Sequence, residues 1–406
     1  MTKPPILSLG DNKLTNNYIS VLDLGEQPWG NDFLSSSDNS KQKKYPLHLV
    51  YCYDTELLQL THFVPKEVMF TEHTYVTTPT LLEDFLNIAK ENIAQFNLKD
   101  GDIILDIGGN DGSQLLQYKK LGINSVINFE SAKNIAQLSE KNKVLCINEF
   151  FNLTTAKKFL NKESVKLINA SGVFFHLEEL HSVIDGINYC LHQDGIFVVQ
   201  FMYAGAMIEN LNFDTIYHEH LCYYTVHSLV KLLKKYNLYL EDGYYTELHS
   251  GSVVAKFRKY PTEKTVRAKQ LVESDKKYNL QAFLDFGDKI KLRRNNLREV
   301  LQNLKAQNKK IYAYGAPVKG STLMNYMGID NTLIDKAVEV NPLKIGTYTP
   351  GSNIPVVAET STDLPDYYLL LAHNFADKII AKNSHLFHKG VKFILPFPDV
   401  KIIDNG

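Results

Sequence analysis

Four consecutive polar side chains, Tyr217-His218-Glu219-His220, form the most chemically suggestive stretch of the 406-residue chain. Burying all four without partners would cost about 1–3 kcal/mol for each unpaired group, so a functional site accounts for them better than a packed core. A histidine held by Glu or Tyr suits general-base catalysis because its ring titrates near neutral pH. In an extended chain Tyr217 and Glu219 share one face while His218 and His220 share the other, so one pair could be catalytic and the other structural.

A metal site and an exposed loop are the alternatives to a catalytic role for this run. His218 and His220 could bind a metal ion, but the sequence supplies no convincing third ligand, and we predict that no metal is bound here. The run could also be an exposed polar loop without a function. It follows the last strong strand candidate of the central region, where a substrate would meet a cofactor, and this position favours catalysis.

A second informative segment, residues 103–112, has the pattern of a strand, a turn and the start of a helix. Its glycines let the backbone adopt unusual torsions and let a ligand approach closely. The order Asp-x-Gly-x-x-x-Gly differs from the dinucleotide pattern Gly-x-Gly-x-x-Gly, which favours S-adenosylmethionine over NAD. Glu130 ends the next strand candidate, where its carboxylate could accept both ribose hydroxyls. A tight strand-to-helix connection without a ligand is the alternative. The predicted cofactor-binding residues are Asp106, Gly108, Asn110, Asp111, Gly112 and Glu130.

Three further side chains are weaker candidates. His176 follows the predicted strand 167–170, at a carboxyl end beside the expected cofactor, although a lone histidine in an apolar stretch is more often a core residue. Tyr75 and His249 could be ordinary packing or surface residues when they are read alone.

The elements that must position these residues are short apolar segments alternating with helical stretches between Asp102 and Phe201. Fully apolar strands are buried on both faces by helices, which indicates an open parallel α/β sheet. Such sheets bind ligands at the carboxyl ends of their strands, where Asp106, Glu130 and His176 fall. The predicted strands are Ile103–Ile107, Val126–Phe129, 144–147, 167–170 and 196–201.

The flanking segments differ from this central region. The first 75 residues show weak periodicity and predict a small, irregular domain. Residues 266–306 are rich in Lys, Leu, Gln and Glu and suggest long helices. Strand and helix patterns then alternate from Lys310 onward, which predicts a second, smaller Rossmann-like fold. We therefore expect an α/β protein with domains over residues 1–75, 76–260 and 261–406, the two α/β domains facing each other across a cleft.

The composition limits the class of partner. The chain has 44 Lys and Arg against 45 Asp and Glu. This balance gives no electrostatic reason to expect nucleic acid or an anionic membrane, so we expect a small-molecule substrate. The sequence shows no signal-peptide pattern and no apolar run of bilayer length, which predicts a soluble, cytoplasmic protein. The oligomeric state stays open between a monomer and a homodimer. The four cysteines stand far apart and indicate neither a disulfide framework nor a zinc clip.

Segments spread over nearly the whole chain resemble the nucleotide-sugar C-methyltransferases, which methylate a carbon of a keto-deoxyhexose attached to a nucleoside diphosphate. Many methyltransferases share the first glycine loop, whereas the Tyr-His-Glu-His run combined with Gly-Ala-x-x-Lys-Gly is far more specific. The matching segments are residues 22–28, 58–60, 106–112, 213–220, 249–252, 314–320, 350–351 and 374–375.

The resemblance implies a fold and a reaction. The fold is a class I methyltransferase Rossmann-like domain with a zinc-binding N-terminal domain and a C-terminal Rossmann-like domain that helps hold the nucleotide-sugar. In the implied reaction His220 removes a proton from the carbon beside the ketone, Glu219 orients or polarises its ring, and the enolate accepts a methyl group. Tyr217, His176 and Tyr75 would contact the keto sugar and its oxyanion.

The C-terminal domain supplies the remaining implied contacts. The loop 315–319 follows a strand candidate and precedes a helix, so its amides and the Lys319 ammonium could meet the diphosphate. A tight turn with an exposed lysine is equally compatible with the pattern. The predicted substrate-binding residues are His249, Gly315, Lys319 and Asn374.

The sequence departs from the family pattern in the N-terminal domain. Where the family has two cysteine pairs, only Cys52 remains, with Thr55 in the place of its partner. One thiol cannot hold a structural zinc ion, so we predict that zinc is absent and that packing alone stabilises this domain. Gln200 and His373 stand where family members often carry Glu and Trp, which leaves the identity of the sugar open.

Three alternative functions remain at this point. The nearest is an O- or N-methyltransferase of another metabolite, which would share the cofactor site and differ at the acceptor. The spacing of residues 106–112 disfavours an NAD(P)-dependent enzyme. A non-catalytic subunit that retains affinity for S-adenosylmethionine is the third, and the intact run 217–220 argues against it.

Elemental analysis of the purified protein tests the metal prediction. We expect a zinc content well below one ion per chain, because the ligand set has lost most of its thiols. A stoichiometric zinc content that survives dialysis against a chelator would contradict the prediction.

Overall fold

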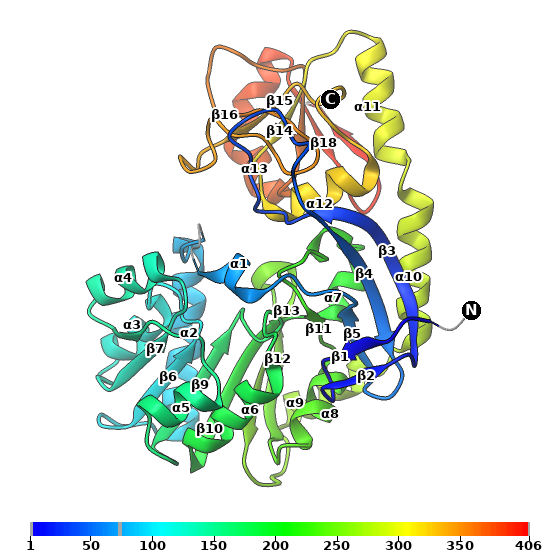
Figure 1. Ribbon diagram of the computed structural model, residues 1–406. Coiled ribbons are helices and arrows are strands. Elements are labelled where there is room, and N and C mark those ends of the chain that lie inside the picture. The colour runs from blue at the N-terminus through cyan, green and yellow to red at the C-terminus, as the bar shows by residue number, and fades with distance from the viewer. Residues whose placement is uncertain (1–2, 72–74, 405–406) are drawn as a thin grey trace.

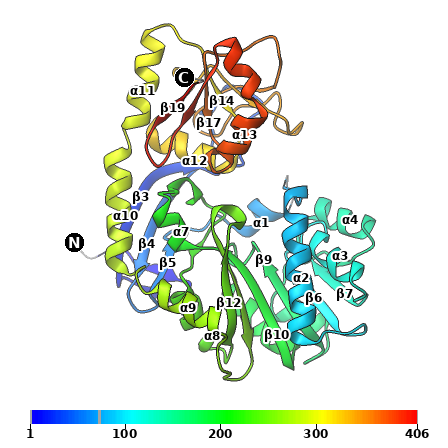
Figure 2. The same ribbon diagram turned by 180° about the vertical axis from the view of Figure 1, so that it is seen from behind.

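The computed structural model describes residues 3–71 and 75–404, which fold around sheets of seven, six, four and two strands (Figures 1 and 2). The seven-stranded and six-stranded sheets lie at opposite ends of the molecule. The long strands β3 (Tyr18–Pro28) and β4 (Lys44–Cys52) and the helix α10 (Leu280–Arg293) run along one side between them. Segments from both ends of the chain therefore connect the two α/β units.

The seven-stranded sheet has the order β12-β13-β10-β9-β6-β7-β8. Its strands β6 to β10 are parallel, and β13 runs antiparallel to both of its neighbours. This is the class I methyltransferase topology that the sequence predicted. The strands are β6 (Ile103–Ile107), β7 (Val126–Phe129), β8 (Leu145–Ile147), β9 (Val165–Ser171), β10 (Leu191–Met202), β12 (Tyr239–Thr246) and β13 (Ser252–Arg258).

Helices cover both faces of this sheet because successive strand residues point to opposite sides. In β6, Ile104 packs against α2 and α3, whereas Leu105 packs in the cluster with α5, α6 and α8. The helices are α2 (Leu82–Phe96), α3 (Ser113–Lys120), α4 (Lys133–Lys141), α5 (Leu153–Phe159), α6 (Leu180–Cys190), α7 (Ala204–Glu209) and α8 (Val226–Lys234). The five predicted strands are all present, and β9 and β10 are longer than the sequence indicated.

The N-terminal part consists mainly of antiparallel strands, more regular than its weak periodicity suggested. Its four-stranded sheet has the order β11-β5-β4-β3. The edge strand β11 (Cys222–Tyr223) comes from the middle of the chain and pairs with β5 (Leu57–Leu60). The sheet is therefore completed by residues that closely follow His220. The remaining elements are β1 (Ile6–Ser8), β2 (Lys13–Thr15) and α1 (Lys66–Phe70).

The C-terminal unit is a six-stranded sheet of order β16-β15-β14-β17-β18-β19, parallel except for β19. It matches the predicted second Rossmann-like fold, and three helices precede it where long helices were predicted. The elements are α9 (Val266–Asp275), α11 (Asn296–Ala306), β14 (Ile311–Tyr314), α12 (Val318–Met327), β15 (Lys336–Glu339), β16 (Val356–Ala358), β17 (Tyr367–Leu370), α13 (Ala376–Lys382), β18 (Lys392–Leu395) and β19 (Lys401–Ile403).

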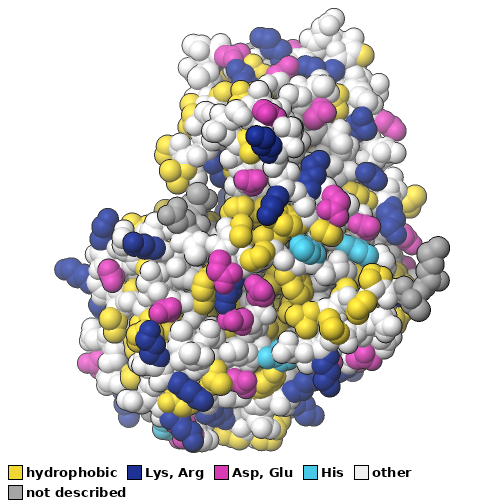
Figure 3. All heavy atoms as spheres, viewed as in Figure 1, with side chains coloured by type: hydrophobic (Ala, Val, Ile, Leu, Met, Phe, Trp, Pro, Cys, Tyr) yellow, Lys and Arg dark blue, Asp and Glu magenta, His cyan; other side chains and the backbone are white. Residues whose placement is uncertain are grey.

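The N-terminal sheet and the C-terminal unit share one hydrophobic core with α10. A Cβ added to Gly287 would lie 2.0 Å from the carbonyl oxygen of Val21, so the helix and β3 are in direct backbone contact. On the face in Figure 3, hydrophobic side chains gather where the upper and lower parts of the molecule meet, and basic and acidic side chains are interspersed around them. These units therefore pack as one body beside the methyltransferase sheet.

The residues left from the family's zinc pattern are packed inside the N-terminal domain. Cys52 and Thr55 are both buried, and burial, followed by the nearby charges of Asp11 and Asp54, raises the pKa of the Cys52 thiol to about 12. A protonated thiol is a poor zinc ligand. Within residues 3–71 and 75–404, no three His, Cys, Asp or Glu side chains are grouped to hold a metal ion. Helices formed by these residues also lack the length and apolar character needed to cross a bilayer.

Candidate active site

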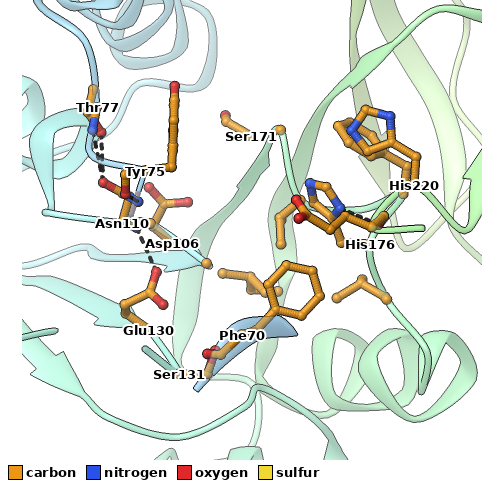
Figure 4. Close-up of a pocket in the computed structure, with 18 of the residues that line it drawn as sticks. Phe70, Tyr75, Thr77, Asp106, Asn110, Glu130, Ser131, Ser171, His176 and His220 are labelled. Carbon is orange, nitrogen blue, oxygen red and sulfur yellow. Dashed lines mark hydrogen bonds between the residues drawn. The ribbon is translucent and has the colours of Figure 1, made fainter. Parts of the chain in front are cut away.

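A pocket of about 510 Å³ lies between the methyltransferase sheet and the C-terminal unit. All three parts of the chain line it: Asn31 from the N-terminal part, residues from the carboxyl ends of β6, β7, β9 and β10, and Lys344 from the C-terminal unit. Figure 4 shows Asp106, Asn110 and Glu130 at one end of the pocket and His176 and His220 at the other. One cavity therefore joins the two sets of residues that the sequence singled out.

The loop after β6 is held in shape by its own polar contacts. The amide of Asn110 donates to Oε2 of Glu130 over 3.1 Å, and the amide of Ala132 donates to Oε1 over 2.8 Å. Gly108 and Asn110 both have positive φ, which turns the chain sharply at the end of the strand. A carboxylate accepts about four hydrogen bonds, so Glu130 can fix the loop and still accept ribose hydroxyls.

Asp106 carries the strongest indication that a ligand belongs at this end. Its side chain is 1% exposed, and Oδ1 has no hydrogen-bond partner among the described residues. Burial, reinforced by the charge of Glu130, raises the pKa of this carboxyl well above its ordinary value. A Cβ on Gly109 would lie 2.8 Å from Oδ2 of Asp106. A glycine at this position therefore allows the backbone to lie close to the Asp106 carboxyl group. A cationic ligand with hydrogen-bond donors fits this set of residues.

The two remaining predicted loop residues act on the helix that follows. Oδ1 of Asp111 accepts a hydrogen bond of 3.1 Å from the amide of Ser113, at the start of α3. Gly112 has positive φ and would meet Ser139 and Val144 if it carried a side chain. Neither is among the residues that line the pocket, so their contribution is to the shape of the loop.

His220 lines the opposite end of the pocket and is 3% exposed. Its Nδ1 lies 2.8 Å from the carbonyl oxygen of Thr215. Because a carbonyl oxygen can only accept, Nδ1 carries the proton, and Nε2 of the neutral ring carries the lone pair that can take up another. The ring also lies against Tyr217 and Phe175, with centroids 3.9 and 4.7 Å away.

His176 stands beside His220, with 5.0 Å between the two imidazole centroids. Its Nδ1 donates to the carbonyl oxygen of Glu219, so its Nε2 is an acceptor when the ring is neutral. Burial and the nearby charge of Glu219 raise the pKa of the Tyr217 phenol well above its ordinary value, so Tyr217 remains a neutral hydrogen-bond donor. Tyr75 lines the same pocket, and its carbonyl oxygen accepts a bond of 3.1 Å from Asn110.

The Glu219 carboxylate connects the site to the N-terminal part of the chain. Its Oε1 accepts hydrogen bonds from Nε1 of Trp29 over 2.8 Å and from Nδ2 of Asn31 over 2.7 Å. The family resemblance implied that Glu219 orients or polarises the His220 ring, and this role stays a prediction. At Nδ1 of His220 the bound group is the Thr215 carbonyl. Trp29 and Asn31 were not predicted as site residues, because nothing in the sequence around them indicates a contact with Glu219.

The expected division of the polar run into two faces is wrong, because the segment turns instead of extending. The 3-10 helix η2 (Phe213–Thr215) and a bond of 2.9 Å from the amide of His220 to the carbonyl of Tyr217 coil the chain. Tyr217, Glu219 and His220 consequently line the pocket together. His218 packs against Tyr45 of the N-terminal sheet, and burial lowers its pKa to about 4.

The predicted substrate contacts are only partly represented in the pocket: Pro317 and Val318 of the 315–319 loop line it. Gly315, Lys319 and Asn374 are not among the residues that line the pocket, and the Lys319 ammonium donates to Oδ1 of Asn374. His249 falls in the 3-10 helix η3 (Leu248–Ser250), and its side chain lies outside the described part of the structure. The roles of these four residues in substrate binding stay predictions.

Asn341 and Lys344 are the polar C-terminal residues that reach the pocket. They follow the carboxyl end of β15, a position that could have marked them in the sequence. The Lys344 ammonium donates to the carbonyl oxygen of Ala316 over 2.8 Å, which leaves further N–H donors on the same group. Burial lowers the pKa of Lys344, although the charges of Glu339 and Glu219 oppose this shift.

Comparison with known proteins places three family models along the chain. Residues 15–70 match a "Putative zinc binding domain", residues 81–242 a "Methyltransferase domain" and residues 247–398 a "C-methyltransferase C-terminal domain". The chain is 27% identical over 399 residues to the C-methyltransferase NovU of Streptomyces niveus, covering 96% of this chain and 95% of that protein.

Two further similarities concern only part of the chain. An uncharacterized protein of Methanocaldococcus jannaschii, MJ1252, is 32% identical over 115 residues, which are 28% of this chain and 42% of that protein. The solved structure of geranyl diphosphate C-methyltransferase from Streptomyces coelicolor A3(2), in complex with Mg²⁺, geranyl diphosphate and S-adenosyl-L-homocysteine, is 9% identical. It covers 43% of this chain and 77% of that chain, with a TM-score of 0.34.

Replacing Glu130 by Gln tests the cofactor end. We expect S-adenosylmethionine to bind about 10–100-fold more weakly, because a charge-assisted hydrogen bond contributes about 1.5–3 kcal/mol and an amide offers only one acceptor oxygen. Isothermal titration calorimetry measures the affinity. Glu140→Gln, on the exposed face of α4, is the matched control and should bind like the wild type. Unchanged affinity in Glu130→Gln would remove Glu130 from the cofactor site.

Proposed function

The chain is an S-adenosylmethionine-dependent C-methyltransferase, and we propose that it methylates the carbon beside the ketone of a nucleoside-diphosphate-linked 4-keto-deoxyhexose. The observation that carries this proposal is the position of His220, whose Nε2 can accept a proton in the same pocket as Asp106 and Glu130. A base and an electrophilic methyl group within one cavity are what carbon methylation requires.

His220 is the proposed base. A carbon beside a ketone becomes acidic because the charge left by its proton spreads onto the keto oxygen. The Thr215 carbonyl holds the Nδ1 proton of His220, so Nε2 receives the proton from carbon, and the resulting imidazolium keeps the same hydrogen bond. A ring fixed in one tautomer does not need to reorganise before it acts.

Tyr217 is the proposed donor to the enolate oxygen. Its phenol stays protonated because burial and Glu219 raise its pKa. A donor aimed at developing charge typically contributes about 2.7–4 kcal/mol. The neutral His176 ring presents an acceptor at Nε2, so it suits a sugar hydroxyl better than the oxyanion. This tautomer separates the roles of two residues that the sequence analysis had grouped together.

Asp106, the loop after β6 and Glu130 would hold the cofactor. When bound there, S-adenosylmethionine supplies a methyl group on a sulfonium that departs as a neutral thioether, so no acid is needed for the leaving group. Phe70 and Phe175 pack around the two histidines, with Phe70 5.5 Å from the His176 ring, and these side chains keep water from the base.

Lys344 and Asn341 are the proposed contacts for the diphosphate. They line the pocket on the C-terminal side, opposite the methyltransferase sheet. A partly buried ammonium near a phosphate binds as a point charge with several donors. Because residues of the C-terminal unit also line the pocket, the pocket supports a substrate larger than the sugar alone.

Replacing His220 by Asn tests the base. We expect turnover on 4-keto-deoxyhexose nucleotides to fall by about 10²–10⁴-fold, the usual contribution of a general base, while affinity for S-adenosylmethionine changes little. Mass spectrometry measures methylation, and solvent deuterium uptake at the carbon beside the ketone measures proton removal. His218→Gln is the neighbouring control, because an amide N–H can replace the contact with the carbonyl of Tyr45. Retained turnover in His220→Asn would refute the assignment.

Replacing Lys344 by Met tests the diphosphate contact. We expect KM for the nucleotide-sugar to rise about tenfold or more, because a hydrogen bond to a charged group contributes about 1.5–3 kcal/mol, while the affinity for S-adenosylmethionine stays the same. Lys319→Met serves as a comparison, since Lys319 is not among the residues that line the pocket. A larger rise in KM for Lys319→Met than for Lys344→Met would reverse this assignment.

A further inference from the structure

A buried pair of side chains joins the loop that carries His220 to the C-terminal unit. Asp214, in η2, is fully buried, and its Oδ2 accepts a hydrogen bond of 2.8 Å from Nε2 of His373. His373 begins the 3-10 helix η4 (His373–Phe375), and its side chain is 7% exposed. The two residues come from separate units, so the contact crosses between them.

Asp214 directly precedes Thr215, the residue whose backbone carbonyl is hydrogen-bonded to His220. The next residue, Thr215, supplies the carbonyl oxygen that accepts from Nδ1 of His220. The turn between them is closed by bonds of 3.2 Å from the amide of Thr215 to Asn212 and 2.9 Å from the amide of Ile216 to Phe213. A shift of Asp214 within so short a turn would carry the Thr215 carbonyl with it.

Lys319 completes the charged environment of this pair. Its charge faces Asp214, and its ammonium donates to Oδ1 of Asn374, the residue that follows His373. Burial alone would raise the pKa of Asp214, but the charges of His373 and Lys319 and the bond to His373 hold the pKa below its ordinary value. The titratable groups gathered here are Asp214, His373 and Lys319, from η2, η4 and α12.

We propose that Asp214 and His373 are positioning residues that hold His220 in its reactive tautomer and orientation through the Thr215 carbonyl. Lys319, which the sequence analysis associated with phosphate, supplies the charge that keeps Asp214 ionised. The C-terminal unit thereby sets the geometry of the base as well as lining the pocket. The inference deepens the proposed function and rests on the role given there to His220.

His373→Phe is the main test variant. The phenyl ring preserves packing against Phe397, whose ring lies 5.5 Å from that of His373, but it removes the donor to Asp214. We expect kcat to fall roughly 10–100-fold, the effect of a small misplacement of a catalytic group, with KM and the affinity for S-adenosylmethionine nearly unchanged. His388→Phe, at an exposed site of the same unit, should have wild-type kcat.

A spectroscopic measurement distinguishes a role in positioning the His220 ring from a role in stabilising the fold alone. Two-bond ¹⁵N–¹H spectra of histidine-labelled full-length protein report the tautomer of each ring, and His220→Asn identifies the His220 signals. We expect a single Nδ1–H tautomer for His220 in the wild type and a tautomer mixture in His373→Phe. A lowered Tm with an unchanged tautomer and kcat would overturn the proposal.

The Asp214 position provides a second pair of variants, which keeps the test decisive if His373→Phe folds poorly. Asp214→Asn retains an acceptor for Nε2–H of His373, whereas Asp214→Ala removes it. We expect Asp214→Asn to keep the His220 tautomer and more of the turnover than Asp214→Ala, and equal losses in both would contradict the proposal. The tautomer is measured without substrate, so absence of turnover on 4-keto sugars would count against the proposed function and not against this link.

Discussion

The hydrogen bond from Nδ1 of His220 to the carbonyl oxygen of Thr215 decides which nitrogen carries the proton in the neutral ring. A backbone carbonyl is an acceptor in every protonation state, so this bond survives proton uptake by the ring. A carboxylate in its place would stabilise the imidazolium more strongly and make it slower to release its proton. The geometry of the whole polar run follows from this contact, because the chain must coil through η2 to bring residue 215 back to residue 220.

At the opposite end of the pocket two acidic side chains are buried close together, and burial, reinforced by the charge of Glu130, raises the pKa of Asp106. Asp106 and Glu130 are both buried, and one oxygen of Asp106 has no donor among the described residues. Two carboxyl groups in a low-dielectric setting favour a cationic ligand over an anionic one. A sulfonium donor with an ammonium group satisfies that preference better than its uncharged thioether product would. The same electrostatics therefore bears on both cofactor capture and product release.

Local patterns predicted the elements that depend on local sequence. The apolar strand β6, the glycine loop after it and Glu130 could be located because strand ends converge at one edge of a parallel sheet. His220 was singled out by the run of polar residues 217–220, and the structure places it in the same pocket. The orientation of His218 and His220 could not be predicted, because this segment forms a turn and the sequence analysis assumed an extended chain. The contacts of Glu219 with Trp29 and Asn31 depend on folding that brings distant segments together. The pairing of Lys319 with Asp214 could not be predicted for the same reason, since Asp214 belongs to another unit.

The edge strand β11 has a consequence for synthesis on the ribosome. Strand β5 pairs with β4 on one side and with Cys222 and Tyr223 on the other, so the outer edge of β5 stays open until more than half of the polypeptide has emerged. An open strand edge attracts other chains. The four-stranded sheet cannot be completed before residues 222 and 223 are present, so completion of the first sheet depends on the stretch that also contains His220.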